Sequence, residues 1–143
     1  MNSVKMLIKN KIAAELSFIS PEAKIIEALR MMAEKNIGAL MVMKEGRLVG
    51  ILSERDYARK VALLGRTSVE TPVSDIMATP VLTVSPQQNR EECMALMTSH
   101  RVRHLPVVDN GRVVGMLSIG DLVKDALMEQ EATIHHLENY VNS

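Results

Sequence analysis

The sequence GRLVGILSERD at Gly46–Asp56 recurs as GRVVGMLSIGD at Gly111–Asp121, an offset of 65 residues (46 to 111). Each copy begins with a turn, continues as an apolar run and ends in the polar step Ser-x-x-Asp, where a helical pattern begins. Without a gap, the alignment extends to residues 20–60 and 85–125, and 13 of the 41 paired positions are identical. Ordinary residue usage gives about two or three identities by chance, so the chain contains a genuine internal repeat.

Each repeat is too small to be stable by itself, because a unit of roughly 60 residues buries too little of its surface. Two copies are also too few for a solenoid, which needs at least about three. We therefore expect the two repeats to pack on each other as one body with pseudo-twofold symmetry. The predicted divisions are a first repeat at 1–65, a linker at 66–72, a second repeat at 73–125 and a C-terminal helical extension at 126–143.

Within each repeat the hydrophobic period alternates between strand and helix, which predicts the order β-α-β-β-α. This order indicates the α+β class, with helices flanking small sheets. The expected strands lie at 16–19, 38–43 and 48–52 in the first repeat and at 81–84, 105–108 and 113–117 in the second. A short helical turn is expected at 73–77, and the last helix is expected to continue nearly to residue 143, with a break around 129–131.

Proline and glycine mark the predicted boundaries of these elements. At the end of the first strand of each repeat, a Ser-Pro pair (20–21 and 85–86) is expected to place proline in the first turn of the next helix. A turn dipeptide that ends in glycine (45–46 and 110–111) separates two apolar runs in each repeat, which is typical of a β-hairpin.

The composition excludes several classes of partner. The 17 basic and 17 acidic residues balance to a formal charge of +0, so there is no basic excess to attract a nucleic acid or an anionic membrane. Aromatic residues make up 2%, no run of about 18 apolar residues exists, and the first residues do not resemble a secretory signal. We therefore expect a cytoplasmic protein without nucleic-acid or membrane partners, whose single cysteine, Cys93, is buried and inert.

The step Ser-x-x-Asp, at Ser53–Asp56 and Ser118–Asp121, has two interpretations that the residues alone leave open. In the first it is a capping box, in which serine accepts from a backbone N–H of the new helix and the aspartate reaches back. In the second the helix entrance binds a ribonucleotide, with free N–H groups for phosphate and a carboxylate that accepts from both ribose hydroxyls. Two matching copies favour two related sites over two accidental caps.

The two β-α-β-β-α units, the hydrophobic–Gly–hydrophobic strand before Ser-x-x-Asp and the run Arg-His-Leu-Pro-Val-Val-Asp at 103–109 resemble a tandem pair of CBS domains. The likeness extends from Val4 to about Asp125, and the tail is similar to that of stand-alone CBS-pair proteins of the bacterial and plant type. The resemblance implies a compact Bateman module that associates with a second module as a disk-shaped homodimer. It also implies clefts between the repeats that bind an adenosyl ligand such as AMP, ADP, ATP, NAD(H) or S-adenosylmethionine.

The resemblance assigns ribose binding to Asp56 and Asp121, with Ser53 and Ser118 beside them. Each cleft of such a pair combines the Ser-x-x-Asp of one repeat with strand residues of the other. The expected neighbours of Asp56 are Thr79, Pro80, Val102, Arg103, His104 and Pro106. The expected neighbours of Asp121 are Ala14, Ile37, Gly38, Ala39 and Met41. The Asp56 cleft thus contains a guanidinium and an imidazole that its counterpart lacks, so it is expected to prefer a phosphorylated nucleotide, and the Asp121 cleft a less charged ligand or none.

Other functions find less support in the sequence. The four histidines have no spacing that completes a metal site, and no nucleophile, phosphate-loop or dinucleotide motif indicates an enzyme. We expect a non-catalytic regulator that requires no metal or cofactor. The alternative is a constitutive dimeric scaffold with vestigial clefts that contacts an unidentified target protein. An apolar stripe in the last helix fits core packing better than a partner site, although both allow a homodimer; it comprises Ile134, Leu137, Tyr140 and Val141.

Overall fold

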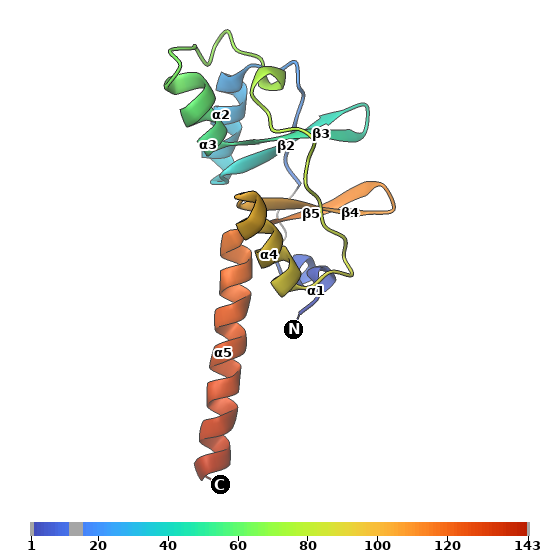
Figure 1. The fold of residues 1–143 in the computed structure, drawn as a ribbon, viewed down its shortest axis with the longest axis vertical. Helices are drawn as coiled ribbons and strands as arrows, with labels where there is room; N and C mark the ends of the chain where they lie inside the picture. Colours follow the sequence, from blue (N-terminus) through green and yellow to red (C-terminus); the bar gives the residue numbers. More distant parts are fainter. Residues whose placement is uncertain (1, 12–15, 143) are drawn as a thin grey trace. The chain divides into compact units, whose positions relative to one another are not determined.

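The computed structural model describes residues 2–11 and 16–142 and divides into two compact units. The first-repeat unit is Glu15–Leu82, and the second-repeat unit combines Met1–Ala14 with Thr83–Ser143 (Figure 1). Helices cover small sheets in both units, which confirms the predicted α+β class. Among the described residues, no helix combines the length and the apolar character that crossing a bilayer would require.

The first-repeat unit is built on a three-stranded sheet in the order β1-β2-β3. The short strand β1 (Phe18–Ile19) runs parallel to β2 (Ala39–Lys44), and β3 (Arg47–Ser53) returns antiparallel to β2. Helix α2 (Ile25–Lys35) packs on this sheet through buried side chains at helical spacing, namely Ile25, Ala28 and Met32. After β3 the chain continues as α3 (Glu54–Tyr57) and a π-helical turn, η1 (Ala58–Ala62).

The second-repeat unit repeats this plan with a two-stranded sheet of β4 (His104–Asp109) and β5 (Arg112–Ser118). The helices of this unit that correspond to α2 and α3 are α4 (Arg90–His100) and α5 (Ile119–Asn142). The prediction of a strand at 81–84 is wrong, because this segment forms only a single bridge, between Val84 and Val107. The buried apolar residues of the unit are Val4, Leu7, Val84, Cys93, Met97, Leu105, Val107, Leu117 and Leu122.

Segments outside the repeats complete each unit. Helix α1 (Val4–Asn10) belongs to the second-repeat unit, where the Val4 amide donates to the Gln88 carbonyl (2.7 Å) and the Val4 side chain is fully buried. The predicted short turn is present as the 3₁₀ helix η2 (Val73–Asp75), and it lies in the first-repeat unit. The domain divisions drawn from the repeat pattern remain predictions, since contacts group the residues around each repeat by packing rather than by order along the chain.

Both predicted hairpins are confirmed, with two-residue turns at equivalent positions. Glu45 and Gly46 have φ angles of 52° and 75°, and Asn110 and Gly111 have 50° and 79°. Two consecutive positive φ values define the turn type whose twist matches antiparallel strands, which is why glycine and asparagine are suitable there. Both hairpins also shift register once, between Val42 and Met43 and between Val107 and Val108.

The predicted role of the two Ser-Pro pairs is wrong. Helix α2 begins at Ile25 and α4 at Arg90, several residues beyond each proline. The Ala23 amide donates to the Ser20 carbonyl (3.2 Å) and the Gln88 amide to the Ser85 carbonyl (3.2 Å), so each proline is the second residue of a β-turn. Proline is favoured in that position for the same fixed φ that suits a helix start, and the sequence pattern does not distinguish the two.

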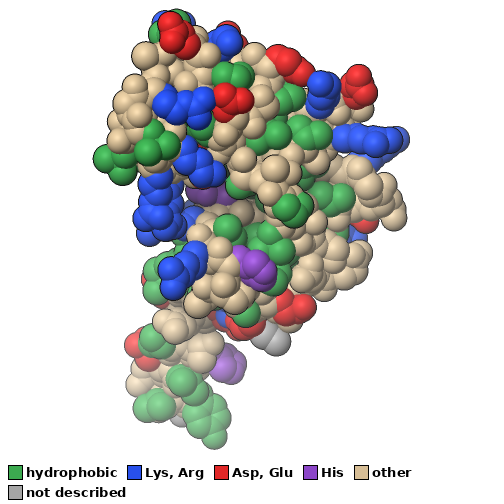
Figure 2. Space-filling model, turned by 45° about the horizontal axis from the view of Figure 1, so that its top comes forward, with side chains coloured by type: hydrophobic (Ala, Val, Ile, Leu, Met, Phe, Trp, Pro, Cys, Tyr) green, Lys and Arg blue, Asp and Glu red, His purple; other side chains and the backbone are tan. Residues whose placement is uncertain are grey.

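The last helix differs from the prediction in two respects. Helix α5 is continuous from Ile119 to Asn142, because the segment 129–131 contains good helix formers and neither glycine nor proline. The preference for core packing of its apolar stripe is also wrong, since the side chains of 127–142 are exposed; those of the stripe, Ile134, Leu137, Tyr140 and Val141, are 56%, 57%, 79% and 78% exposed. Hydrophobic side chains gather on this outer part of the molecule (Figure 2).

Candidate functional site

The first helix entrance is a complete capping box. Strand β3 ends at Ser53, whose extended backbone delivers the chain to α3. The Ser53 hydroxyl accepts from the Asp56 amide (3.2 Å), and Asp56 Oδ2 accepts from both the amide and the hydroxyl of Ser53 (2.9 Å each). The Asp56 side chain is 19% exposed, so it is accessible to a ligand from solution.

The second entrance has the same geometry where β5 leads into α5. The Ser118 amide donates to Asp121 Oδ2 (2.8 Å), and the Asp121 amide donates to the Ser118 hydroxyl (3.1 Å). The Asp121 side chain is 28% exposed. The capping interpretation is therefore confirmed at both entrances. It does not exclude the ribose interpretation, because the cap uses Oδ2 of a carboxylate that remains partly exposed.

Each carboxylate has a different lysine beside it. Lys60 follows Asp56 by one helical turn, with Nζ 3.6 Å from Oδ1 and a side chain that is 46% exposed. Lys11 closes the C-terminal end of α1 and places Nζ 2.9 Å from Asp121 Oδ2. The same ammonium donates to the Met116 carbonyl (2.8 Å), which fixes it from a second side. Lys11 is a site residue that the sequence analysis missed, because no local pattern links positions 110 residues apart.

The surroundings of Asp121 change its acidity. Burial acts to raise the pKa of this carboxyl, but the hydrogen bond from the Ser118 amide and the Lys11 ammonium outweigh it, with a further contribution from the Ser118 hydroxyl. The net result is a pKa below the ordinary value of an aspartate. Asp121 is therefore a carboxylate, and a hydrogen-bond acceptor only, throughout the neutral range.

Each entrance lies beside the start of a strand in its own repeat. The Glu54 amide donates to the Gly38 carbonyl (3.1 Å), and Ala39 pairs with Ser53. The equivalent contacts in the second unit join the Ile119 amide to the Arg103 carbonyl (2.9 Å) and pair His104 with Ser118. Gly38 and Ala39 therefore lie at the Ser53 entrance, and Arg103 and His104 lie at the Ser118 entrance. These contacts join residues of the same repeat, whereas the prediction combined residues of different repeats.

The remaining predicted site residues are distributed over both units. Thr79 and Pro80 share the unit of Asp56, where they are exposed, are joined by a cis peptide bond and follow the bridge between Ala78 and Ile51. The predicted combination of each aspartate with strand residues of the other repeat stays a prediction, as do the roles of those residues; they are Ile37, Gly38, Ala39, Met41, Val102, Arg103, His104 and Pro106. Ala14 lies outside the described residues.

Neither the thiol nor the histidines form a metal site in the described part of the chain. No group of three His, Cys, Asp or Glu side chains there could hold a metal ion. Cys93 is fully buried in α4, and burial together with nearby Glu92 raises its pKa to about 11. The predicted burial of the cysteine is confirmed, and a thiol with so high a pKa is a poor nucleophile and ligand at neutral pH.

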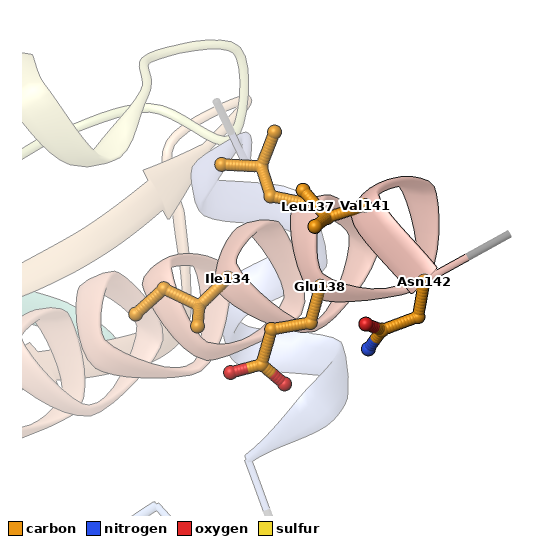
Figure 3. Close-up of a pocket in the computed structure, with 5 residues that line it drawn as sticks. All are labelled: Ile134, Leu137, Glu138, Val141 and Asn142. Atoms are coloured by element: carbon orange, nitrogen blue, oxygen red, sulfur yellow. The ribbon is translucent and has the colours of Figure 1, made fainter.

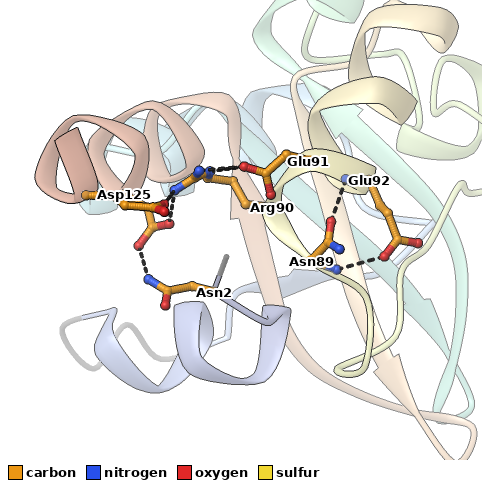
Figure 4. Close-up of polar contacts among 7 residues, drawn as sticks. Asn2, Asn89, Arg90, Glu91, Glu92 and Asp125 are labelled. Atoms are coloured by element: carbon orange, nitrogen blue, oxygen red, sulfur yellow. Dashed lines mark hydrogen bonds and ion pairs between the residues drawn. The ribbon is translucent and has the colours of Figure 1, made fainter. Parts of the chain in front are cut away.

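A buried arginine cluster fixes the root of α5 (Figure 4). The Arg90 side chain is 9% exposed. Its guanidinium donates to two carboxylates of α5, Asp125 (2.8 Å) and Glu129, and its Nε donates to the neighbouring Glu91 (3.0 Å). The Asn2 side chain donates to the other oxygen of Asp125 (2.7 Å). Glu129 is the main cause of a raised pKa for Arg90, so this side chain is always charged. The cluster joins three segments of one unit and is structural.

Comparison with known proteins agrees with this fold. The model of the CBS domain family matches the chain twice, at residues 9–63 and 73–127. The chain is 39% identical over 122 residues to the mitochondrial CBS domain-containing protein CBSX3 of Arabidopsis thaliana, a match that covers 82% of this chain and 59% of that relative. It is 34% identical over 125 residues to the CBS domain-containing protein YhcV of Bacillus subtilis, covering 87% of this chain and 89% of that protein.

Solved structures show the same likeness. The crystal structure of the CBS domain NE2398 is 49% identical and superposes with a TM-score of 0.84, covering 88% of this chain and 98% of that one. The CBS domain pair of MJ0100, solved in complex with methylthioadenosine and S-adenosyl-L-methionine, shares the fold at 24% identity, with a TM-score of 0.78 over 90% of this chain and 98% of its own. The predicted resemblance is confirmed. The chain belongs to the CBS domain family and contains two CBS domains in tandem.

Proposed function

We propose that this protein is a regulatory module that binds an adenosyl ligand at its Ser-x-x-Asp entrances. The observation that carries the proposal is the repetition of one geometry, a partly exposed aspartate held by the serine that precedes its helix, at Asp56 and Asp121. A carboxylate can accept from both hydroxyls of a ribose. The pair of MJ0100, with its two adenosyl ligands, is a precedent for the ligand class within the same fold.

The two entrances differ in the charge that a ligand would meet. At Asp121 the carboxylate is already paired through Oδ2 with Lys11, so a ribose would bind beside that ammonium. At Asp56 the lysine is 3.6 Å away and nearly half exposed, so its competition is weaker. Together with the predicted approach of Arg103 and His104, this difference favours a phosphorylated nucleotide such as AMP, ADP or ATP at Asp56. We propose weaker binding, or a less charged ligand, at Asp121.

The module is proposed to act without catalysis. The Ser53 hydroxyl donates to Asp56 Oδ2 and accepts from the Asp56 amide, and the Ser118 hydroxyl accepts from the Asp121 amide, so both hydroxyls are engaged in the caps of their own helices. Regulation requires instead that the ligand bind two conformations or association states with different affinity. The homodimer and an unidentified target protein are part of this proposal.

The alternative, a constitutive dimeric scaffold, is favoured by a different observation. Helix α5 exposes apolar side chains over its outer half, and such surface on a monomer commonly marks an interaction site. The scaffold and the sensor share this surface. They differ in whether the entrances bind a ligand, and binding measurements therefore decide between them.

Thermal unfolding of the full chain with AMP, ATP, NADH or S-adenosylmethionine tests the proposal. A ligand at about 100 times its dissociation constant stabilises the folded state by roughly 2.7 kcal/mol, which raises Tm by several degrees. Asp56→Asn keeps one side-chain oxygen for the cap but removes the charge, and it is expected to weaken nucleotide binding at least about tenfold. Asp75→Asn, at an exposed ion pair, is the control.

Two results would contradict the proposal. If none of the four ligands raises Tm while the chain remains associated, the scaffold is the better description. If a ligand binds equally well to the wild type, to Asp56→Asn and to Asp121→Asn, the ribose assignment is wrong even though the protein is a nucleotide sensor.

A further inference from the structure

Helix α5 carries an apolar seam with the spacing of a coiled coil. Its members recur alternately every three and four residues: Val123, Leu127, Gln130, Ile134, Leu137 and Val141. In heptad notation, Leu127, Ile134 and Val141 occupy position a, and Val123, Gln130 and Leu137 occupy position d. The five apolar members are between 43% and 78% exposed, so the chain itself does not cover the seam.

The seam lies on the opposite side of α5 from the surface that packs in its own unit. Leu122 is buried there, and Asp125 and Glu129 bind Arg90. At about 100° per residue, Leu122, Glu129 and Asp125 lie roughly 100°, 120° and 160° around the helix from the centre of the seam. A second helix can therefore lie along the seam without displacing α4. The arginine cluster holds the root of α5 in place, so the seam is presented by a fixed helix.

We propose that the seam binds the same seam of a second copy of this chain, as a parallel and in-register two-stranded coiled coil. The polar residue in the seam identifies the partner. Gln130 would be buried at its layer, and a buried carboxamide requires a hydrogen-bonding partner. In a parallel, in-register pair, Gln130 meets the Gln130 of the other copy, and the two carboxamides can bond to each other. A single polar layer of this kind sets register in coiled coils.

The residues beside the seam are compatible with the parallel direction. Lys124, Glu131 and Glu138 occupy position e, whereas Ala126, Thr133 and Tyr140 occupy position g. In a parallel pair, e faces g of the partner, so each of these glutamates meets an uncharged side chain. In an antiparallel pair, e faces e, so Glu131 would lie opposite the Glu131 of the other copy, whereas Lys124 would lie opposite Glu138; charge alone therefore does not select the direction. An antiparallel pair would, however, place Gln130 opposite an apolar residue.

The shape of the seam suits the insertion of a side chain. Ile134, Leu137, Glu138 and Val141, with Asn142 at the edge, surround a hollow of about 320 Å³ on the helix surface (Figure 3). Four residues at positions a, d, e and a form the hole that receives a d-position side chain in a parallel coiled coil. Leu137 of the second copy would fill it. β-Branched Ile134 and Val141 at a with Leu137 at d favour two strands over three or four in the outer part of the seam, whereas Leu127 at a and Val123 at d do not follow this pattern.

Cysteine cross-linking of the full chain tests partner, direction and register together. Native Cys93 is buried, so a new thiol on α5 reports alone. Leu137→Cys is expected to form a disulfide-linked dimer under mild oxidation. Ala132→Cys, on the far side of the same helix, is the matched control and should remain uncross-linked. If Leu137→Cys cross-links no better than the control, or links only to Leu127→Cys in a mixture, the parallel in-register pair is wrong.

Sedimentation gives an independent measurement over a dilution series. Ile134→Glu with Leu137→Glu is expected to at least halve the mass of the associated wild type, whereas Ala132→Glu should leave it unchanged. A wild type that is monomeric throughout the series, or a mass that the seam substitutions do not change, overturns the proposal. Both variants should keep any nucleotide-induced rise in Tm, so failure of the seam and failure of nucleotide binding are distinguished.

Discussion

Asp56 and Asp121 occupy equivalent positions in the two repeats, yet their cations reach them differently. Lys60 belongs to the same helical segment as Asp56 and is nearly half exposed. Lys11 comes from another helix, lies 2.9 Å from Asp121 and is also bound to the Met116 carbonyl. The Lys60 ammonium is likewise held by a backbone carbonyl, that of Ile76 (3.2 Å), but its distance of 3.6 Å from Asp56 makes its ion pair the weaker of the two.

This difference leads to a prediction for Lys11→Met. The substitution keeps an unbranched apolar stem but removes the ammonium, so the pKa of Asp121 is expected to rise. Carboxyl-detected NMR titration measures it directly. Lys60→Met, at the other entrance, is the control and should leave the titration of Asp121 unchanged. A pKa of Asp121 that does not respond to Lys11→Met would show that the hydrogen bonds from Ser118 alone account for its acidity.

The same contact predicts a pH dependence of stability. The pKa of Asp121 is lower in the folded chain than in the unfolded one, so the carboxylate contributes stability above the unfolded pKa, about 4. That contribution is lost as the pH falls through the folded pKa. Because both side chains are about one-third exposed, the lysine contributes no more than about 1 kcal/mol. Urea unfolding should show the wild type and Lys11→Met differing at pH 7 and converging in acid.

At the scale of elements, local chemistry was predictable and long-range contacts were not. The hairpins followed from the dipeptides at 45–46 and 110–111, because a two-residue turn with positive φ has few alternatives. The prediction that the Ser-Pro pairs begin helices was wrong, because proline suits both a helix start and a β-turn. The capping boxes were predictable from the pattern Ser-x-x-Asp. The ion pairs of Lys11 with Asp121 and of Arg90 with Asp125 were not, because they join residues far apart in the sequence that no local pattern links.

The glycines in the middle of the two return strands lead to a prediction about packing. A Cβ added at Gly50 would lie 2.4 Å from Met77 Sδ, and one added at Gly115 would lie 2.9 Å from Ile8 Cγ2. Gly50→Ala and Gly115→Ala are therefore expected to lower the free energy of unfolding by about 1–3 kcal/mol, measured by urea denaturation. Gly120→Ala, whose nearest atom is 3.5 Å away, should be neutral or stabilising. Equal effects at all three positions would mean that close packing is not why glycine stands in the strands.

At the scale of the whole molecule, the repeat in the sequence and the compact units are not the same division. The pattern at 20–60 and 85–125 revealed two copies of one fold, but each copy is completed by a segment that the repeat does not include. Residues 2–11 contribute buried side chains to the second-repeat unit. They also contribute the hydrogen bond from Asn2 to Asp125 and the Lys11 ammonium that pairs with Asp121. These contacts could not be predicted from periodicity, because α1 has no counterpart in the repeat alignment.

The dependence of one unit on residues 2–11 predicts a localised loss of stability. Leu7 is 7% exposed and Met6, its neighbour on α1, is 49% exposed. Leu7→Ala removes buried methyl groups and is expected to cost roughly 2–5 kcal/mol, whereas Met6→Ala should change stability by about 0.5 kcal/mol or less. Native-state hydrogen exchange, followed by mass spectrometry, should show the lost protection mainly in residues 83–142, because these share a unit with α1. Loss centred on residues 16–82, or equal effects of the two substitutions, would mean that α1 does not stabilise the second-repeat unit in the way its contacts indicate.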